Sequence, residues 1–186
     1  SPMVAGKRTD LEAVQKKILD GSSLKKIAMD HFSLYLRYRK GLESFVAMTA
    51  LPRTWKSRVE VLYGPTGVGK TRFVFDMYKS QDKDKLYVHA GGQWFDGYVG
   101  QEWVLFDDFD PEYGLRWDLF LRLLDRYEMQ VQVKGSFVNW CPKKIYITTN
   151  THPSWWYPKR DWAPLKRRIE QIHTWNLEEK RFFVEK

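Results

Sequence analysis

The first fifty residues carry hydrophobic side chains at helical spacing and no run that is typical of a strand. In the first helix that this spacing predicts, the apolar positions are Leu11, Val14, Ile18 and Leu19. Thr9 and Glu12 form a capping box, which predicts that this helix begins near residue 9. A Gly-Ser-Ser break separates it from a second helix, and a third is predicted over about 31–48. Three short helices bury too little surface to fold alone, so residues 3–50 are predicted to pack on the rest of the chain or on a neighbouring subunit.

Beyond Pro52 the pattern changes to short apolar runs that alternate with helical segments. The runs predict strands over 59–63, 86–89, 103–106, 143–150 and 173–175. Helices are predicted over 72–78, 115–127 and 163–172, and a β-hairpin over 129–138. Alternation of this kind is typical of an α/β fold with a parallel sheet. We therefore expect a small helical bundle over residues 3–50, followed by one α/β domain over residues 51–186.

The segment after the first strand matches the phosphate-binding loop, G-x-x-x-x-G-K-[ST]. It reads Gly64-Pro65-Thr66-Gly67-Val68-Gly69-Lys70-Thr71. Its glycines allow the tight turn that points backbone N–H groups at a triphosphate. Lys70 supplies a positive charge for the β- and γ-phosphates, and Thr71 a hydroxyl for Mg²⁺. Because strand, loop and helix follow in the required order, the sequence predicts a site for a nucleoside triphosphate and Mg²⁺.

A second group of polar residues follows the apolar run 103–106, which ends in Asp107 and Asp108. We expect this strand to lie next to the phosphate-loop strand, as a Walker B motif. Asp107 is then assigned to the metal ion that Thr71 binds, and Asp108 to the attacking water. The two roles could be exchanged, and the alternative is a pair of acids that only cap a strand.

Asn150, Lys134 and a basic stretch near the C-terminus are further candidates. Asn150 ends a predicted core strand, where ligands of open α/β sheets bind, and it could hold the attacking water or simply form a turn. Lys134 lies at the tip of the predicted hairpin, where a lysine is usually only solvated. Arg167 and Arg168 are either surface residues or, in a ring ATPase, the position of a neighbour's arginine finger.

The composition of the chain indicates a polyanionic partner. The chain of 186 residues has a formal net charge of +8, which favours binding to nucleic acid. Its 43% hydrophobic residues suffice for a core, and no run is long enough to span a membrane. The single cysteine excludes an internal disulfide and a cysteine-based zinc site. Ser1-Pro2 before Met3 is typical of a remnant of an expression vector.

Five stretches carry a resemblance to a known family. They are GPTGVGKT, WFDGYVGQEWVLFDDF, WDLFLRLLDRYEMQVQVKGSFV, KKIYITTNTHPSWWY and LKRRIEQI. In this order they resemble the helicase part of the replication-associated protein (Rep) of circoviruses and related circular single-stranded-DNA viruses. That family belongs to helicase superfamily 3, whose small AAA-like ATPase domains assemble into hexameric rings around single-stranded DNA.

The resemblance implies a role for each matching residue. Gly64, Gly69, Lys70 and Thr71 match Walker A, Asp107 and Asp108 match Walker B, and Asn150 matches the sensor of motif C. Lys134-Gly135 matches the motif whose pore hairpin grips the DNA backbone, and Arg167 or Arg168 matches the arginine finger. Residues 3–50 correspond to the helical oligomerisation segment. ATP and Mg²⁺ are the implied cofactors, and a homo-oligomer and single-stranded DNA are the implied partners.

The sequence departs from the full-length family in one respect. Its members carry an N-terminal nicking endonuclease with a His-hydrophobe-His motif and a Tyr-x-x-Lys motif. This sequence has no such His pair, and its nearest tyrosine pattern, Tyr35-Leu36-Arg37-Tyr38, lacks the lysine. We therefore expect the C-terminal part of a longer protein, which does not itself cut DNA.

The expected function is ATP-dependent translocation on single-stranded DNA during rolling-circle replication, in the nucleus of the host cell. The alternative is a nucleotide-dependent assembly or DNA-binding module without strand-separating activity. A small-molecule kinase is disfavoured because the sequence offers no lid-like cluster of arginines.

Overall fold

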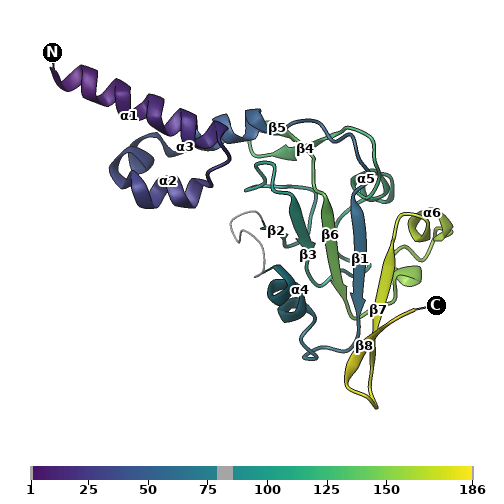
Figure 1. Ribbon diagram of the computed structural model, residues 1–186. Helices are drawn as coiled ribbons and strands as arrows, with labels where there is room; N and C mark the ends of the chain where they lie inside the picture. Colours follow the sequence, from purple (N-terminus) through teal and green to yellow (C-terminus); the bar gives the residue numbers. More distant parts are fainter. Residues whose placement is uncertain (1, 79–85, 186) are drawn as a thin grey trace.

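A computed structural model describes residues 2–78 and 86–185 of the chain (Figure 1). Its centre is a six-stranded sheet in the order β2-β3-β6-β1-β7-β8, and β4 and β5 form a separate hairpin. The strands are β1 (Arg58–Tyr63), β2 (Leu86–His89), β3 (Trp103–Phe106), β4 (Gln130–Val133), β5 (Ser136–Asn139), β6 (Lys144–Thr149), β7 (Gln171–Asn176) and β8 (Arg181–Val184). Strands β2, β3, β6, β1 and β7 run parallel, whereas β8 runs antiparallel to β7. The predicted α/β fold with a parallel sheet is confirmed.

One prediction about the sheet is wrong. The strand that ends in the two acids, β3, does not lie next to the phosphate-loop strand β1, because β6 lies between them. All three strands are apolar, so hydrophobicity along the chain identifies them without ordering them. Within the sheet, the end of β6 therefore lies between the end of β1 and the acidic end of β3.

Different elements cover the two faces of the sheet because side chains alternate along each strand. Val61 and Ile147 point to the face that is covered by α5 (Trp117–Leu123), the hairpin and the long loops. Leu105 and Tyr146 point to the opposite face, where Val74 of α4 (Lys70–Tyr78) packs on them. The sheet is thus buried on both sides, as a parallel sheet requires.

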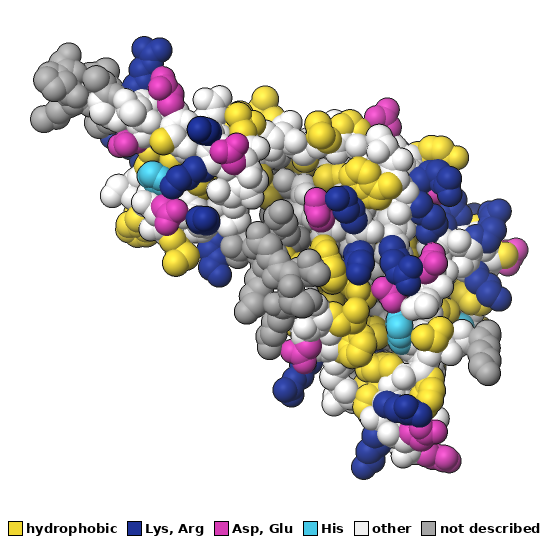
Figure 2. All heavy atoms as spheres, in the orientation of Figure 1, with side chains coloured by type: hydrophobic (Ala, Val, Ile, Leu, Met, Phe, Trp, Pro, Cys, Tyr) yellow, Lys and Arg dark blue, Asp and Glu magenta, His cyan; other side chains and the backbone are white. Residues whose placement is uncertain are grey.

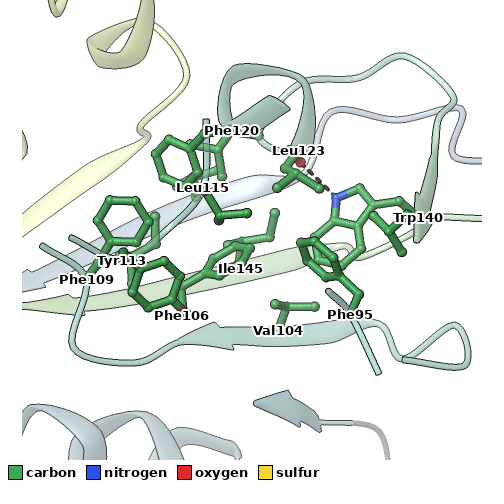
Figure 3. Packing of buried hydrophobic residues seen from close by; sticks show 14 of the residues in the cluster. Phe95, Val104, Phe106, Phe109, Tyr113, Leu115, Phe120, Leu123, Trp140 and Ile145 are labelled. Carbon is green, nitrogen blue, oxygen red and sulfur yellow. Dashed lines mark hydrogen bonds between the residues drawn. The ribbon is translucent and has the colours of Figure 1, made fainter. Parts of the chain in front are cut away.

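Figure 3 shows the larger cluster, in which aromatic side chains pack over β3 and β6. At one end Phe95, from the loop after β2, meets Trp140 at a ring-centroid distance of 5.3 Å. Trp140 also donates from Nε1 to the backbone oxygen of Leu123 at 2.9 Å. At the other end Phe109 stacks on Phe120 at 4.6 Å. The hairpin, α5 and the segment after β3 therefore share one core.

Helix α5 is shorter than the predicted helix 115–127 because it ends at Leu123. Arg53, which is buried in the linker after the helical segment, lies at this end. Its guanidinium donates to the backbone oxygens of Arg122 and Leu123, at 2.8 Å each, and of Tyr127, at 2.7 and 3.1 Å. Burial lowers the pKa of Arg53 to about 10, so this side chain stays charged near neutral pH. A cation is favourable at the carbonyl end of a helix.

The C-terminal region also differs from the prediction of a helix over 163–172. Helix α6 (Ala163–Lys166) is one turn long, and the backbone N–H of Glu170 already donates to the oxygen of Val59 at 2.8 Å. This bond starts the pairing of β7 with β1, which extends the predicted final strand 173–175 to six residues. Strand β8, which the sequence analysis does not anticipate, then pairs with β7.

The N-terminal helices are α1 (Pro2–Leu19), α2 (Leu24–Asp30) and α3 (Phe32–Thr49). They lie to one side of the sheet in Figure 1. Because α1 begins at Pro2, the predicted start at the capping box is wrong, and Thr9 and Glu12 lie inside the helix. The predicted break before α2 is confirmed, since Ser23 caps this helix by accepting from the backbone N–H of Lys26 at 3.1 Å.

This helical segment has a small core of its own, made of Val14, Ile18, Ile27 and Leu42. Leu19, which shares the apolar spacing of this helix, is not part of that core, because Leu19 is 61% exposed. Further apolar side chains of the segment are exposed, as Figure 2 shows for this part of the molecule: Met29, Phe32, Leu36 and Met48. Its apolar surface is therefore only partly covered.

The segment meets the sheet domain where α3 ends. The side-chain amide of Asn139 on β5 donates to the backbone oxygen of Ala50 at 3.0 Å. A Cβ on Gly100 would lie 2.8 Å from Cβ of Ala50, so only glycine allows this approach. Among residues 2–78 and 86–185, no helix is long and apolar enough to cross a membrane.

Candidate functional site

The phosphate-binding loop connects β1 to α4 at the carboxyl end of the parallel strands. Gly67 and Gly69 have φ angles of 84° and 91°, which glycine adopts without strain. Gly64 has no positive φ, but a Cβ there would lie 2.7 Å from Cβ of Trp175 on β7. Gly64 is thus needed for close packing against β7, and not for the turn that the sequence analysis assigned to it. The other loop positions are the exposed Pro65 and Thr66 and the half-buried Val68.

Lys70 is the first residue of α4, and it is only 6% exposed. Its Nζ donates to the backbone oxygens of Gly64 at 2.8 Å and Pro65 at 2.7 Å, and to Oδ1 of Asn150 at 2.8 Å. Burial lowers the pKa of Lys70, and the negative charges of Asp108 and Asp107 oppose this shift. The ammonium group is therefore held between the loop and the polar end of β6.

Asp107 is hydrogen bonded to both neighbouring elements. Its Oδ1 accepts from the hydroxyl of Thr71 on α4 at 2.7 Å and from the hydroxyl of Thr148 on β6 at 2.7 Å. The oxygen atoms of Thr71 and Asp107 are ligands that suit Mg²⁺, which also keeps water and phosphate oxygens as ligands. The described residues contain no cluster of three or more His, Cys, Asp or Glu that could hold a metal ion alone. The donor set fits a Mg²⁺ that is shared with a bound nucleotide.

Asp108 has an unusual backbone conformation. Its φ is 53°, in the left-handed region that few residues other than glycine, Asn and Asp adopt. Its backbone N–H donates to the hydroxyl of Thr148 at 2.9 Å, which stabilises this conformation. The residue is exposed, and its carboxylate has no hydrogen-bond partner within the described part of the chain. Local strain of this kind is frequent at functional sites.

Asn150 connects the end of β6 to the phosphate-binding loop. Its Oδ1 accepts from Lys70, and its Nδ2 donates to the hydroxyl of Thr66 at 2.9 Å. The side-chain amide is therefore fixed at the loop by two residues of the predicted Walker A motif. This arrangement holds Asn150 beside the phosphate-binding loop.

The two candidate arginines lie in different environments. Arg168 donates from Nε to Oδ2 of Asp125 at 3.1 Å and from Nη1 to the oxygen of Pro164 at 2.7 Å. Its Nη2 forms an ion pair with the same Asp125 oxygen at 2.9 Å. Arg167, just after α6, is exposed, and its side chain has no hydrogen bond or ion pair with residues 2–78 or 86–185. Of the two, Arg167 alone is free to reach another molecule.

Lys134 and Gly135 form the two-residue turn between β4 and β5, as the sequence predicts. Both residues are exposed, and Gly135 has a φ of 82°. The Lys134 ammonium has no ion pair in the described ranges, but its backbone N–H donates to Oδ1 of Asp96 at 2.6 Å. The hairpin thus presents an unpaired positive charge at its tip.

Comparison with known proteins finds a matching family model and several relatives. A family model described as RNA helicase matches residues 60–151, which include the loop, both acids, the hairpin and Asn150. The replication-associated protein of Canary circovirus is 39% identical over 177 residues, which cover 93% of this chain and 58% of that protein. That of Beak and feather disease virus is 36% identical over 87% of this chain and 54% of its own length. That of Human associated cyclovirus 1 is 36% identical over 91% and 62%.

This chain belongs to the circovirus-type replication-associated protein family. It spans a little over half the length of the curated relatives that it matches. A helicase domain of this family implies a nucleotide site, and the cluster around Lys70 and Thr71 is where such a site would lie.

Two residues that contact the candidate site residues were missed by the sequence analysis. Thr148 bridges the two acids, through its hydroxyl to Asp107 and from the backbone of Asp108. The sequence feature that could have revealed Thr148 is the polar end of an otherwise apolar strand. The sequence analysis considered only Asn150 at that end. Asp96 holds the hairpin tip. Nothing in its local sequence indicates that partner, because 38 residues separate the two.

Proposed function

We propose that this chain is the motor part of a viral Rep, which couples ATP hydrolysis to movement along single-stranded DNA. In this proposal identical subunits form a hexameric ring around the DNA during rolling-circle replication in the nucleus of the host cell. The observation that carries it is a set of two hydrogen-bonded pairs at the end of the sheet, Lys70 with Asn150 and Thr71 with Asp107. These are the residue types that a P-loop ATPase needs at this edge.

Each residue has a defined task in this mechanism. The loop N–H groups and Lys70 would bind the β- and γ-phosphates, and Thr71 and Asp107 would hold Mg²⁺, which would offset the charge of the phosphates. Asp108, whose carboxylate is open to solvent, accepts a proton from the attacking water. Asn150 orients that water, since its amide is already fixed beside Lys70.

The ring is supported by what the single subunit leaves exposed. Arg167 is free of partners among the described residues and would enter the site of a neighbour as an arginine finger. The helical segment 3–50 keeps apolar side chains such as Met29, Phe32 and Leu36 exposed, as an oligomerisation segment would. In this proposal the nicking endonuclease belongs to the part of the relatives that this chain does not match.

DNA binding is assigned to the hairpin. Lys134 at its tip would contact the phosphate backbone in the centre of the ring, and Gly135 would let the turn approach closely. The net charge of +8 is consistent with a polyanionic partner. Because the matching family model is described as an RNA helicase, single-stranded RNA is the competitor that a test must include.

The test is steady-state ATP hydrolysis against protein concentration, with single-stranded DNA, with RNA of the same sequence, and with neither. We expect turnover per subunit to rise steeply with concentration, to increase further with DNA, and to vanish in Lys70→Ala. Turnover that is flat with concentration and indifferent to DNA would contradict the ring motor. It would favour the alternative, a nucleotide-dependent assembly or DNA-binding module without strand-separating activity.

A further inference from the structure

The turn of the hairpin that carries Lys134 lacks the geometry that favours two-residue hairpins. Two-residue hairpins are favoured by type I′ or II′ turns, which need a positive φ at the first turn residue. Here Gly135, the second residue, has a positive φ and Lys134 does not. Turns without the primed geometry splay the two strands. With four residues in each strand, the hairpin needs support from outside.

That support comes from the loop between β2 and β3. The backbone N–H of Phe95 donates to the oxygen of Gln132 on β4 at 2.9 Å. One residue later, Oδ1 of Asp96 accepts from the backbone N–H of Lys134 at 2.6 Å. The carboxylate holds the backbone of the turn and leaves the Lys134 ammonium without an ion pair in the described ranges. The loop thus fastens the tip and the strand before it.

The loop is itself fixed to the sheet. The hydroxyl of Tyr87 on β2 donates to the backbone oxygen of Asp96 at 3.1 Å. His89, at the end of β2, contacts the oxygen of Trp94 through Nε2 at 3.0 Å and stacks on Phe95 at 4.5 Å. Burial lowers the pKa of His89 to about 4, so its ring stays neutral and its Nδ1 can accept from Gly91 N–H at 3.3 Å. Asp96 therefore projects from a loop that is held to β2 by these contacts.

We propose that Asp96 is a positioning residue for DNA binding, which fixes the hairpin turn so that Lys134 meets the phosphate backbone. This inference rests on the proposed role of the hairpin in DNA binding. It adds a residue that acts through the backbone of Lys134 and does not touch DNA. An exposed acid next to a polyanion binding site otherwise has no evident use, since its charge repels phosphate.

The direction of the change in DNA affinity when Asp96 is replaced distinguishes a positioning role from a purely electrostatic one. If Asp96 contributed only its charge, its removal would tighten DNA binding, because a repulsive charge disappears. If it positions the turn, Asp96→Ala weakens binding by about fivefold, the worth of one lost hydrogen bond. Asp96→Asn removes the charge and keeps an acceptor oxygen, so it should bind DNA at least as tightly as wild type.

The experiment measures the affinity for a fluorescent single-stranded DNA by anisotropy, in variants first shown to unfold like wild type. Asp118→Ala is the matched control, since Asp118 is an exposed acid on α5 with only a 3.9 Å contact to Arg116. Hydrogen exchange at the Lys134 amide is measured in parallel. We expect faster exchange in Asp96→Ala and exchange near wild type in Asp96→Asn and Asp118→Ala.

Affinity in Asp96→Ala that equals or exceeds wild type would overturn the inference, whatever the exchange rate. Unchanged exchange at Lys134 would overturn it as well, because the turn would then not depend on Asp96. Lys134→Ala distinguishes this failure from that of the proposed function. If Lys134→Ala leaves DNA affinity unchanged, the hairpin is not the DNA site; if it weakens binding while Asp96→Ala does not, only the role of Asp96 is wrong.

Discussion

Lys70 at the carboxyl end of the sheet and Lys134 at the tip of the hairpin are both proposed to bind phosphate groups, but their surroundings differ. Lys70 is buried and donates three hydrogen bonds, to the loop and to Asn150. Lys134 is exposed, and only its backbone is held. The arginines repeat the contrast, since Arg53 is buried among backbone oxygens and Arg167 is exposed without a partner in the described ranges.

The difference follows from where each group acts. Chemistry on a bound nucleotide needs groups that are already oriented, because reorientation during the reaction raises the barrier. A side chain that contacts DNA or a neighbouring subunit cannot be satisfied within its own chain without losing that contact. Under the proposed function, side chains that are hydrogen bonded within the chain act in their own subunit, and exposed, unpaired side chains act on DNA or on a neighbouring subunit. The predictions below test this division.

The largest expected effect belongs to the free arginine. Arg167→Ala should lower ATP turnover by about 10³-fold or more, as the loss of an arginine finger does, without a change in stability. Arg168→Ala should instead reduce the free energy of unfolding by about 1 kcal/mol, because it removes a partly buried ion pair with Asp125. Turnover is measured under saturating ATP, and stability by urea denaturation.

Mixing inactive subunits tests whether Arg167 acts on a neighbour. Lys70→Ala subunits still carry the arginine, and Arg167→Ala subunits still carry an intact loop, so a mixed ring contains some complete sites. We expect partial recovery of hydrolysis. An absence of recovery for Arg167→Ala, together with recovery for Arg168→Ala, would reverse the assignment of the two arginines.

The next effect concerns Asp108. Asp108→Asn removes the proton acceptor but tolerates the left-handed φ, so turnover should fall by about 10²–10⁴-fold while the fold stays intact. Asp108→Ala should lose turnover and also some stability, because alanine is strained at this φ. If Asp107→Asn spares turnover at high Mg²⁺ more than Asp108→Asn does, the assigned roles hold; the reverse order would exchange them.

Replacement of the buried Arg53 should lower the stability of the protein and should not act directly on ATP turnover. Arg53→Met leaves the backbone oxygens at the end of α5 without a donor, which should reduce the free energy of unfolding by about 3 kcal/mol. Arg53→Lys keeps the charge but cannot reach all of these oxygens, so its loss should be intermediate. Equal stability of the three proteins in urea would show that the contacts of Arg53 add nothing net.

The smallest effect is expected at the hairpin tip. Lys134→Ala should weaken DNA binding by about tenfold at low salt and reduce the slope of log affinity against log salt by about one, as the loss of one phosphate contact does. ATP hydrolysis without DNA should remain. Lys159→Ala, at another exposed lysine, is the control for net charge; an equal loss there would mean that Lys134 has no special place.

The sequence alone predicts much of the fold because its strongest signals are local. The phosphate-binding loop, the acidic end of β3 and the hairpin turn are each formed by consecutive residues, and the structure places them on the expected elements. Helix ends are predicted less well. Arg53 donates to a backbone oxygen at the end of α5, and the backbone N–H of Glu170 donates to Val59 just before β7 begins. Both are contacts between segments far apart in the chain.

What the sequence determined by itself is the chemistry: a triphosphate loop, two acids, an amide and a basic surface, each readable from residue types at fixed spacing. The tertiary structure decided how they meet. It inserted β6 between β1 and β3, so that Thr148 bridges Asp107 and Asp108. It paired Arg168 with Asp125 and left Arg167 free, although the two are neighbours in the chain. Strand order and side-chain partners depend on packing between distant segments, which no local pattern records.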